Sequence, residues 1–520
     1  MITKRYRTLV LLFAALSFMS FATQTQAAPD TRIKTRSGVV AGVATDGVAS
    51  FKGIPYAAPP VGDLRWVEPK AVKAWAGDKR ADTYGDACIQ KPGLSAENGG
   101  DPGRLSEDCL TLNVWTPKTG AKAKLPVIVW IHGGAFVFGA GGMPIYDGTP
   151  MAKKGAVFVS INYRLGPLGF FAHPALDKAR PKGPSNFGLL DQIAALKWVQ
   201  ANIAAFGGDA GNVTIMGQSA GGKSVLALYS SPLARGLFNR GVAMSVYILP
   251  DVKPDKARLV GAAVAKGVGL DGANASLADL RRVPAEKFGD IADKEAGLGP
   301  VGIVGDEVLP VSIVDTFAAG REQKLPLIIG NTSDDVSVLA GFGLEPAAIV
   351  KKLGVAGFAL GALYPGVSGD EMARQALRDI VFTMNTRWTA DRHAKRAPTW
   401  RYYFDYVPEK TRDKHPNGVG HGADIPFFLD TADIYEGTAR DLTETDRAMA
   451  RQASDLLFAF ARDGEPAAKG VPTWQSDRVL RDRTMIFGPE KIEQRRNFMK
   501  VRLDVLKGAT RIVDTLFVRN

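Results

Sequence analysis

One ten-residue stretch, Val213–Gly222 (VTIMGQSAGG), restricts the fold of this 520-residue chain more than any other. Apolar residues lead into Ser219, with Gly217 two positions before it and Gly221 two positions after it. This pattern predicts a strand that turns sharply into a helix, because only small neighbours let the two segments pass so closely. At such a turn the serine hydroxyl projects clear of the sheet, beside the backbone N–H of Ala220. Short patterns of this kind also arise by chance. The prediction of a reactive serine therefore needs support from other stretches that supply its partners.

The segments around this stretch alternate between strand and helix. The continuous apolar run that begins at Leu125, and a second run at Ala156–Asn162, are typical of strands buried on both faces. Apolar residues at helical spacing predict a helix over Ser185–Phe206, which Gly207–Asp209 ends before the strand Val213–Met216. This order predicts an α/β fold, with a mostly parallel central sheet flanked by helices.

The remaining patterns fit additions to such a sheet. Alanine- and charge-rich segments at about 251–320 and 345–397 predict helices over the core, and Arg447–Arg462 predicts an amphipathic helix. Neither a linker nor an internal repeat divides the chain, so residues 28–520 are expected to form one domain. Further strands are predicted at Thr31–Thr35, Val39–Val43, Ala49–Ile54, Leu110–Trp115, Val242–Leu249, Leu325–Gly330 and Thr399–Val407.

The first residues have the pattern of a secretory signal peptide. Basic residues, among them Lys4, precede an apolar run from Leu9 to about Ala22, and Ala27 ends a small-residue cleavage site. Polar residues interrupt the run before about 20 apolar residues accumulate, which disfavours a stable membrane anchor. We therefore expect residues 1–27 to be removed and the mature chain to be secreted or periplasmic.

Charge and cysteine content narrow the function classes. The formal charge of +12 falls to +9 without the three basic residues of the leader, and the other basic residues are scattered among acids. The absence of a basic stripe with interleaved aromatic residues argues against a nucleic-acid partner.

Cys88 and Cys109 are the only cysteines. In an oxidising compartment they predict a disulfide worth about 3 kcal/mol, the alternative being two free buried thiols.

A reactive serine needs a base, nearly always histidine, and a carboxylate that orients the base. In proteins with this kind of elbow, the acid and then the histidine follow the serine. His421 fits, because it lies in a glycine-flanked loop after the predicted strand Thr399–Val407. The other histidines precede Ser219 or lie in charged stretches that predict a solvated surface: His132, His173, His393 and His415.

Two further stretches supply the remaining parts of such a site. Asp334 and Asp335 follow the predicted strand Leu325–Gly330 and precede His421, and the pattern does not choose between them. His132–Ala135 (HGGA) follows a buried strand, where an esterase would carry backbone donors for an oxyanion.

Motifs spread over about residues 31 to 490 resemble the type-B carboxylesterase family. This branch of the α/β hydrolases includes cholinesterases, bacterial para-nitrobenzyl esterases and neuroligins. The resemblance implies the α/β-hydrolase fold with helical insertions over the active site, a serine carboxylesterase activity on small-molecule esters, and no metal or cofactor. The matching runs include FKGIPYA from Phe51, EDCLTLNV from Glu107, HGGAF from His132, FGGD from Phe206 and GQSAGG from Gly217.

The resemblance also implies roles for single residues. Ser219 would be the nucleophile, His421 the base and Asp335 the catalytic acid. Cys88 and Cys109 would form the first disulfide of the family, and Arg65 and Glu107 its buried ion pair. The oxyanion donors would be the backbone N–H groups of Gly134, Ala135 and Ala220.

The chain departs from the family pattern around this triad. Asp335 stands where most members have glutamate, so either its loop lies closer to His421 or Asp334 takes the role. Val336 replaces the glycine that usually follows the acid. Gln218 precedes the nucleophile where cholinesterases have glutamate. Ser245 matches a serine that in relatives joins the acid–histidine network.

The substrate is less constrained than the reaction. The loop from Cys88 to Cys109 contains no aromatic residue, whereas cholinesterases hold quaternary ammonium there by cation–π attraction. Together with Gln218, this favours neutral carboxylic esters over choline esters. Two alternatives stay open: a non-catalytic adhesion or binding module on the same fold, and an amidase or carbamate hydrolase with the same triad. The sequence does not determine acyl and alcohol specificity, the physiological substrate or the oligomeric state.

Overall fold

The computed structural model describes residues 29–92, 100–247, 251–291, 302–352, 360–367, 369–435, 441–477 and 481–508. The expected signal peptide, residues 1–27, therefore lies outside the described residues. No helix in the described ranges is long and apolar enough to cross a membrane.

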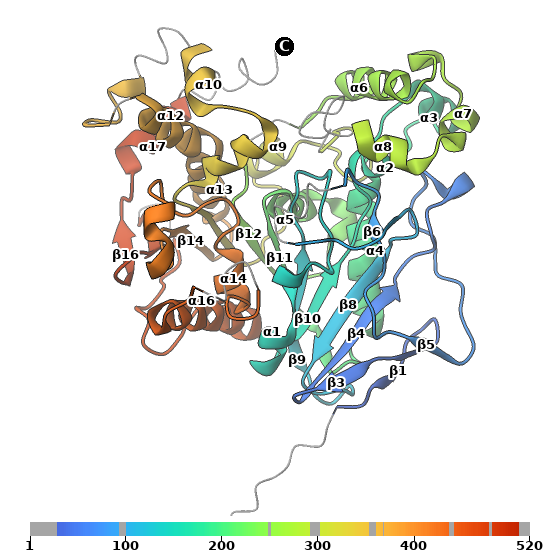
Figure 1. Ribbon diagram of the computed structural model, residues 1–520, viewed down its shortest axis with the longest axis horizontal. Helices are drawn as coiled ribbons and strands as arrows, with labels where there is room; N and C mark the ends of the chain where they lie inside the picture. The colour runs from blue at the N-terminus through green and yellow to red at the C-terminus, as the bar shows by residue number, and fades with distance from the viewer. Residues whose placement is uncertain are drawn as a thin grey trace, which may run out of the picture.

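An 11-stranded sheet forms the centre of the molecule (Figure 1). The strands from β15 to β10 in the sheet order run parallel, and antiparallel strands complete both edges. This is the mostly parallel α/β sheet that the sequence predicts. The order across the sheet is β16 (Ile492–Arg496), β15 (Arg483–Phe487), β14 (Thr399–Phe404), β13 (Leu327–Thr332), β12 (Arg240–Met244), β11 (Gly208–Gln218), β9 (Leu125–Ile131), β10 (Val157–Ile161), β8 (Thr111–Thr116), β4 (Val48–Pro55) and β3 (Val43–Thr45).

Helices bury both faces of this sheet. Alternate residues of β9 show why the strand is continuously apolar: Val129 lies in one large core cluster and Trp130 in the other. On the Val129 side lie α4 (Phe187–Asn202) and α5 (Ala220–Ser230). On the Trp130 side lie α1 (Thr149–Lys153), α14 (Ile425–Leu429) and α16 (Glu444–Asp463).

The insertions are helical, as predicted, and they gather in two groups. In Figure 1, α6, α7 and α8 lie at the upper right, and α10, α12 and α17 lie at the upper left. A π-helical turn, Asp379–Thr383, joins α12 to α13. The bounds are α6 (Pro254–Gly267), α7 (Leu277–Arg282), α8 (Ala285–Ile291), α9 (Ile313–Ala318), α10 (Pro346–Lys352), α12 (Gly369–Arg378), α13 (Met384–His393) and α17 (Lys500–Gly508).

Some elements differ from the sequence-based expectations. The predicted strand Val242–Leu249 ends at Met244, and residues 248–250 lie outside the described ranges. The patterns at Thr31–Thr35 and Val39–Val43 contribute to a separate three-stranded sheet of β1 (Arg32–Lys34), β2 (Val39–Ala41) and β5 (Asp78–Arg80). The remaining elements are the short strands β6 (Ala87–Cys88) and β7 (Leu105–Ser106), and the helices α2 (Gly166–Gly169) and α3 (Pro174–Ala179).

One disulfide and one ion pair hold the segment before β8 in place. Cys88 and Cys109 form a disulfide. Arg65 donates from Nε and Nη2 to the two carboxylate oxygens of Glu107, at 2.7 and 2.6 Å. Both pairs are those that the family resemblance implies.

Candidate active site

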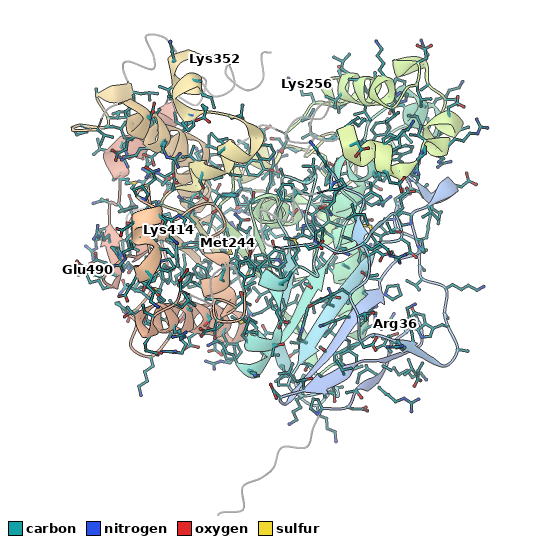
Figure 2. All side chains as sticks on the ribbon, viewed as in Figure 1. Arg36, Met244, Lys256, Lys352, Lys414 and Glu490 are labelled. Carbon is teal, nitrogen blue, oxygen red and sulfur yellow. A yellow bond between two sulfur atoms is a disulfide. The ribbon has the colours of Figure 1, made fainter. Side chains whose placement is uncertain are left out.

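The carboxyl ends of the parallel strands bring distant parts of the chain to one edge of the sheet. Parallel strands end on the same side, so the segments that follow β9, β11, β12, β13 and β14 meet there. Figure 2 labels Met244, the last residue of β12, near the middle of the molecule. Every catalytic residue predicted from the sequence lies in one of these segments.

Ser219 lies at a tight turn between β11 and α5. Its backbone has φ 57° and ψ −120°, a conformation that non-glycine residues rarely adopt. The neighbouring glycines are required by packing, because a Cβ on Gly221 would lie 2.0 Å from the carbonyl oxygen of Ile131. The N–H of Ser219 donates to the carbonyl oxygen of Met244 at 2.9 Å. The elbow geometry predicted from the sequence is therefore present.

Asp335, and not Asp334, faces His421. Oδ1 of Asp335 lies 2.8 Å from Nδ1 of His421, and its Oδ2 accepts the N–H of Thr332 at 2.9 Å. The carboxylate of Asp334 instead accepts two hydrogen bonds from Nη2 of Arg374, at 2.7 and 2.5 Å. The structure thus pairs Asp335 with His421 and Asp334 with Arg374.

The loops that carry the acid and the histidine are bonded directly to each other. The N–H of His421 donates to Oγ of Ser337, and the N–H of Val419 donates to Oγ of Ser333, at 2.9 and 2.8 Å. The N–H of Asp334 donates to the carbonyl oxygen of Val419 at 2.8 Å. These bonds bring the two loops close enough for the short aspartate arm to reach the imidazole.

Val336, which replaces the usual glycine, anchors the acid loop. It is 1% exposed. Its side chain belongs to a small apolar cluster with Leu339, Val350, Ala373 and Leu377. The larger side chain therefore ties the loop to α10 and α12.

The two ring nitrogens of His421 have different surroundings. Because a carboxylate only accepts, Nδ1 carries the proton that is shared with Asp335. Nε2 is buried and has no hydrogen-bond partner among the described residues. The ring of Phe382, in the π-helical turn, lies 5.4 Å from the imidazole ring. His421 and Ser219 both line the same cavity.

The loop after β9 has a strained backbone at the predicted oxyanion donors. Gly134 has φ 103° and Ala135 φ 49°. The carbonyl oxygen of Gly134 accepts the N–H groups of Val137 and Phe138, at 2.9 and 3.0 Å. A Cβ on Gly134 would lie 2.1 Å from the carbonyl oxygen of Phe138, so glycine is required here. Gly134, Ala135 and Ser219 line one cavity, and Ala220 begins α5.

His132 stabilises this loop as a neutral side chain. Burial lowers the pKa of His132 to about 4. Its ring stacks on Tyr163 at 4.4 Å between centroids, and Nδ1 donates to the carbonyl oxygen of Gly133 at 2.8 Å. The histidine of the HGGA motif is therefore structural.

Gln218 and Ser245 lie beside the site without completing a network. Nε2 of Gln218 and Oγ of Ser245 are buried, and neither has a hydrogen-bond partner in the described part of the chain. Ser245 has φ 50°, and its N–H donates to the carbonyl oxygen of Gly330 at 2.7 Å. The structure thus does not show the bond from Ser245 to the acid that the family resemblance implies.

A largely apolar cavity of about 640 Å³ opens above the triad. Within the described ranges, no lysine or arginine lines this cavity, and no cluster of His, Cys, Asp or Glu could hold a metal ion. Its apolar and aromatic lining includes Met143, Ile145, Tyr146, Tyr247, Leu339, Phe342, Val381, Phe382, Val407, Ile425 and Phe427. A mainly apolar lining of this kind is typical of cavities that bind small molecules.

The expectation for His393 was wrong. Instead of lying on a solvated surface, His393 is fully buried. Its Nδ1 lies 3.0 Å from Oε1 of Glu322, and its Nε2 lies 2.7 Å from the carbonyl oxygen of Leu325. The charged neighbours in sequence face outward while the imidazole fastens α13 to the segment before β13. His415 is exposed, as predicted, although it also lines the cavity.

Asp424 is a second buried carboxylate near the triad, and the sequence analysis missed it. It is 0% exposed. Its Oδ2 accepts the hydroxyl of Tyr402 at 2.9 Å, and its Oδ1 has no hydrogen-bond partner among the described residues. Burial, and then the charge of Asp335, raise the pKa of Asp424 to about 7. The only feature of the sequence that could have pointed to Asp424 is its position three residues after His421.

The raised pKa predicts that ionisation of Asp424 destabilises the protein as pH rises. The folded state keeps the proton up to about pH 7, while the unfolded chain loses it near pH 4. The free energy of unfolding therefore falls between these values, by about 4 kcal/mol at most. Asp424→Asn cannot ionise, so its stability relative to wild type should be higher at pH 8 than at pH 4. Urea unfolding of variant and wild type at both pH values measures this difference in stability. A difference that is the same at pH 4 and pH 8 would contradict the prediction.

The chain is similar to known proteins in sequence and in fold. The carboxylesterase family matches residues 29–355 and 368–502. The chain is 36% identical to fumonisin B1 esterase of Sphingopyxis macrogoltabida over 457 residues, covering 83% of this chain and 82% of that protein. It is 35% identical to para-nitrobenzyl esterase of Bacillus subtilis (strain 168) over 477 residues, covering 88% and 95%. A solved para-nitrobenzyl esterase structure superposes with a TM-score of 0.79 at 32% identity, covering 92% of this chain and 99% of that one.

Proposed function

The chain belongs to the carboxylesterase family and is a carboxylic ester hydrolase, and from this premise we propose that it works through an acyl-enzyme on Ser219. The observation that carries this proposal is the 2.8 Å contact between Asp335 and His421. His421 lines the same cavity as Ser219 and the strained Gly134–Ala135 loop. An exported single domain, residues 28–520, would carry out this reaction.

In the first half-reaction, Oγ of Ser219 attacks the ester carbonyl carbon while Nε2 of His421 takes the hydroxyl proton. Asp335 holds the imidazole in the required tautomer and stabilises the imidazolium. The N–H groups of Gly134, Ala135 and Ala220 stabilise the oxyanion. The C–O bond then breaks, and the proton on Nε2 passes to the alcohol, which leaves.

In the second half-reaction, water replaces the alcohol. His421 takes a proton from water, and the resulting hydroxide attacks the acyl carbon. The tetrahedral intermediate collapses, the bond to Oγ of Ser219 breaks, and the proton returns to that oxygen. The carboxylic acid leaves, and the enzyme is restored without a metal or cofactor.

Neutral esters are the proposed substrates. The cavity is mainly apolar, and its described lining contains no cationic side chain to hold a free carboxylate of the substrate. Gln218 is neutral where cholinesterases have an acid, so position 218 offers no charge to attract a cationic alcohol. An apolar acyl group fits this environment better than a charged one.

A fluorophosphonate probe tests the function directly. The probe mimics the tetrahedral intermediate, so it should label the protein at one site, and peptide mapping should locate the label on Ser219. Turnover of para-nitrophenyl esters should show a burst of para-nitrophenol before the steady state, because the acyl-enzyme accumulates. A protein that neither labels nor turns over esters would favour the adhesion or binding module.

Export is proposed from the N-terminal leader pattern and is supported by the disulfide between Cys88 and Cys109. The test is N-terminal sequencing of the protein recovered from the producing cells. A mature chain that begins after Ala27 is expected, and one that begins at Met1 would contradict export.

A further inference from the structure

Gln90 is a buried glutamine that the mechanism above does not use. It is 3% exposed and lies two residues after Cys88. Its side chain makes a matched pair of hydrogen bonds with the backbone of Gly139. The N–H of Gly139 donates to Oε1 at 2.9 Å, and Nε2 donates to the carbonyl oxygen of Gly139 at 3.0 Å. A carboxamide suits this position because it donates and accepts at once, as a peptide group does.

Gly139 closes the loop that carries the proposed oxyanion donors. It has φ 109°, and a Cβ there would lie 2.5 Å from Nδ1 of His132 and 2.8 Å from the carbonyl oxygen of Gly133. The end of the loop is therefore packed against its beginning. A shift of Gly139 would be transmitted to Gly133 and so to the N–H group of Gly134.

The other end of this contact is fixed to the central sheet. Nε2 of Gln90 also donates to the carbonyl oxygen of Cys88 at 3.0 Å. Cys88 is bonded to Cys109, which lies two residues before β8. The glutamine is thus held by a segment that cannot move far from the sheet.

We infer that Gln90 is a positioning residue for the oxyanion donors: its carboxamide holds Gly139 and so fixes the loop that presents the N–H groups of Gly134 and Ala135. Gln90 does not line the cavity, so it acts through the loop and not on the substrate. This inference rests on the proposed function, because it assumes that these donors stabilise the transition state.

The first test is Gln90→Ala, measured with para-nitrophenyl esters. Oxyanion donors act mainly in the transition state, so kcat should fall about 10- to 100-fold while KM changes less than about 2-fold. The rate of fluorophosphonate inactivation should fall by a similar factor. A kcat within about 2-fold of wild type would overturn the inference.

Gln200 offers a matched control outside the cavity. Its Nε2 also donates to two backbone carbonyl oxygens, those of Ala210 and Leu237, at 3.0 and 2.9 Å. Gln200→Ala should lower the urea midpoint and leave kcat unchanged. If both alanine variants lowered kcat equally, Gln90 would have only a general structural role.

Gln90→Glu gives a second readout that does not depend on the alanine variant folding. A carboxylate can accept the N–H of Gly139 but repels the carbonyl oxygens of Gly139 and Cys88, whereas a protonated carboxyl can donate to one of them. The ratio of variant to wild-type kcat should therefore rise as pH falls from 8 to 5. A ratio independent of pH would count against the inference.

The wild-type protein separates this inference from the proposed function. If wild type is labelled at Ser219 and turns over esters but the Gln90 variants match it, only the role of Gln90 is wrong. If wild type itself shows neither labelling nor turnover, the proposed function is wrong.

Discussion

Replacing Ser219 with alanine should lower kcat by about 10⁴- to 10⁶-fold and abolish labelling by fluorophosphonates. The variant loses the hydroxyl oxygen that forms the acyl-enzyme in the proposed mechanism. Substrate binding depends on the cavity walls, so residual affinity for a non-hydrolysable ester analogue should stay close to that of wild type. Para-nitrophenyl ester turnover and active-site titration measure these quantities.

Ser224 provides the control for this substitution. It is a fully buried serine on α5, the helix that follows Ser219, and its Oγ accepts a hydrogen bond from Nε2 of Gln192 at 3.0 Å. Ser224→Ala should cost about 1 kcal/mol of stability and leave kcat within a few-fold of wild type. Labelling that persists in Ser219→Ala would show that another residue is the nucleophile.

The elbow and the sheet could be predicted because their signals are local. A buried parallel strand is a continuous apolar run, as in β9, and the serine turn requires glycines at fixed positions such as Gly217 and Gly221. The order of strands and helices then places the carboxyl ends together. Local sequence therefore accounts for the place of Ser219, of the Gly134–Ala135 loop and of the segments that carry Asp335 and His421.

The parts that sequence reasoning missed depend on contacts between distant residues. His393 lies in a charged stretch, yet Glu322 and Leu325, about 70 positions earlier, enclose its ring. Gln90 contacts Gly139 across 49 positions. The pKa of Asp424 is raised by its burial and by the nearby charge of Asp335. No pattern along the chain encodes such pairs.

Contacts between distant residues also distinguish the two candidate acids. Asp334 and Asp335 are adjacent and chemically identical, so no local signal distinguishes them. Arg374, 40 positions later, pairs with Asp334. The family resemblance pointed to Asp335, and the observed contact with His421 supports the same assignment.

Asp335→Asn should therefore lower kcat by about 10³- to 10⁴-fold, whereas Asp334→Asn should change it less than about 3-fold. An asparagine at 335 can present its NH₂ group to Nδ1, which favours the tautomer with the proton on Nε2. His421 would then be unable to accept the proton of Ser219. Losing the partly exposed Asp334–Arg374 pair should cost about 1 kcal/mol of stability without changing that tautomer. The ranking is measured as kcat on one para-nitrophenyl ester, with urea unfolding as a check on folding.

Asp335→Glu distinguishes the charge of the acid from the length of its arm. Glutamate is the usual residue of the family, but here the hydrogen bonds that Oγ of Ser333 and Oγ of Ser337 accept hold the two loops at a spacing suited to aspartate. The longer side chain keeps the charge and must fold back within a fully buried site, so kcat should fall about 10-fold, far less than in Asp335→Asn. Equal losses in both variants would mean that loop spacing, and not the charge on residue 335, controls His421. A larger loss in Asp334→Asn than in Asp335→Asn would reverse the assignment of the acid.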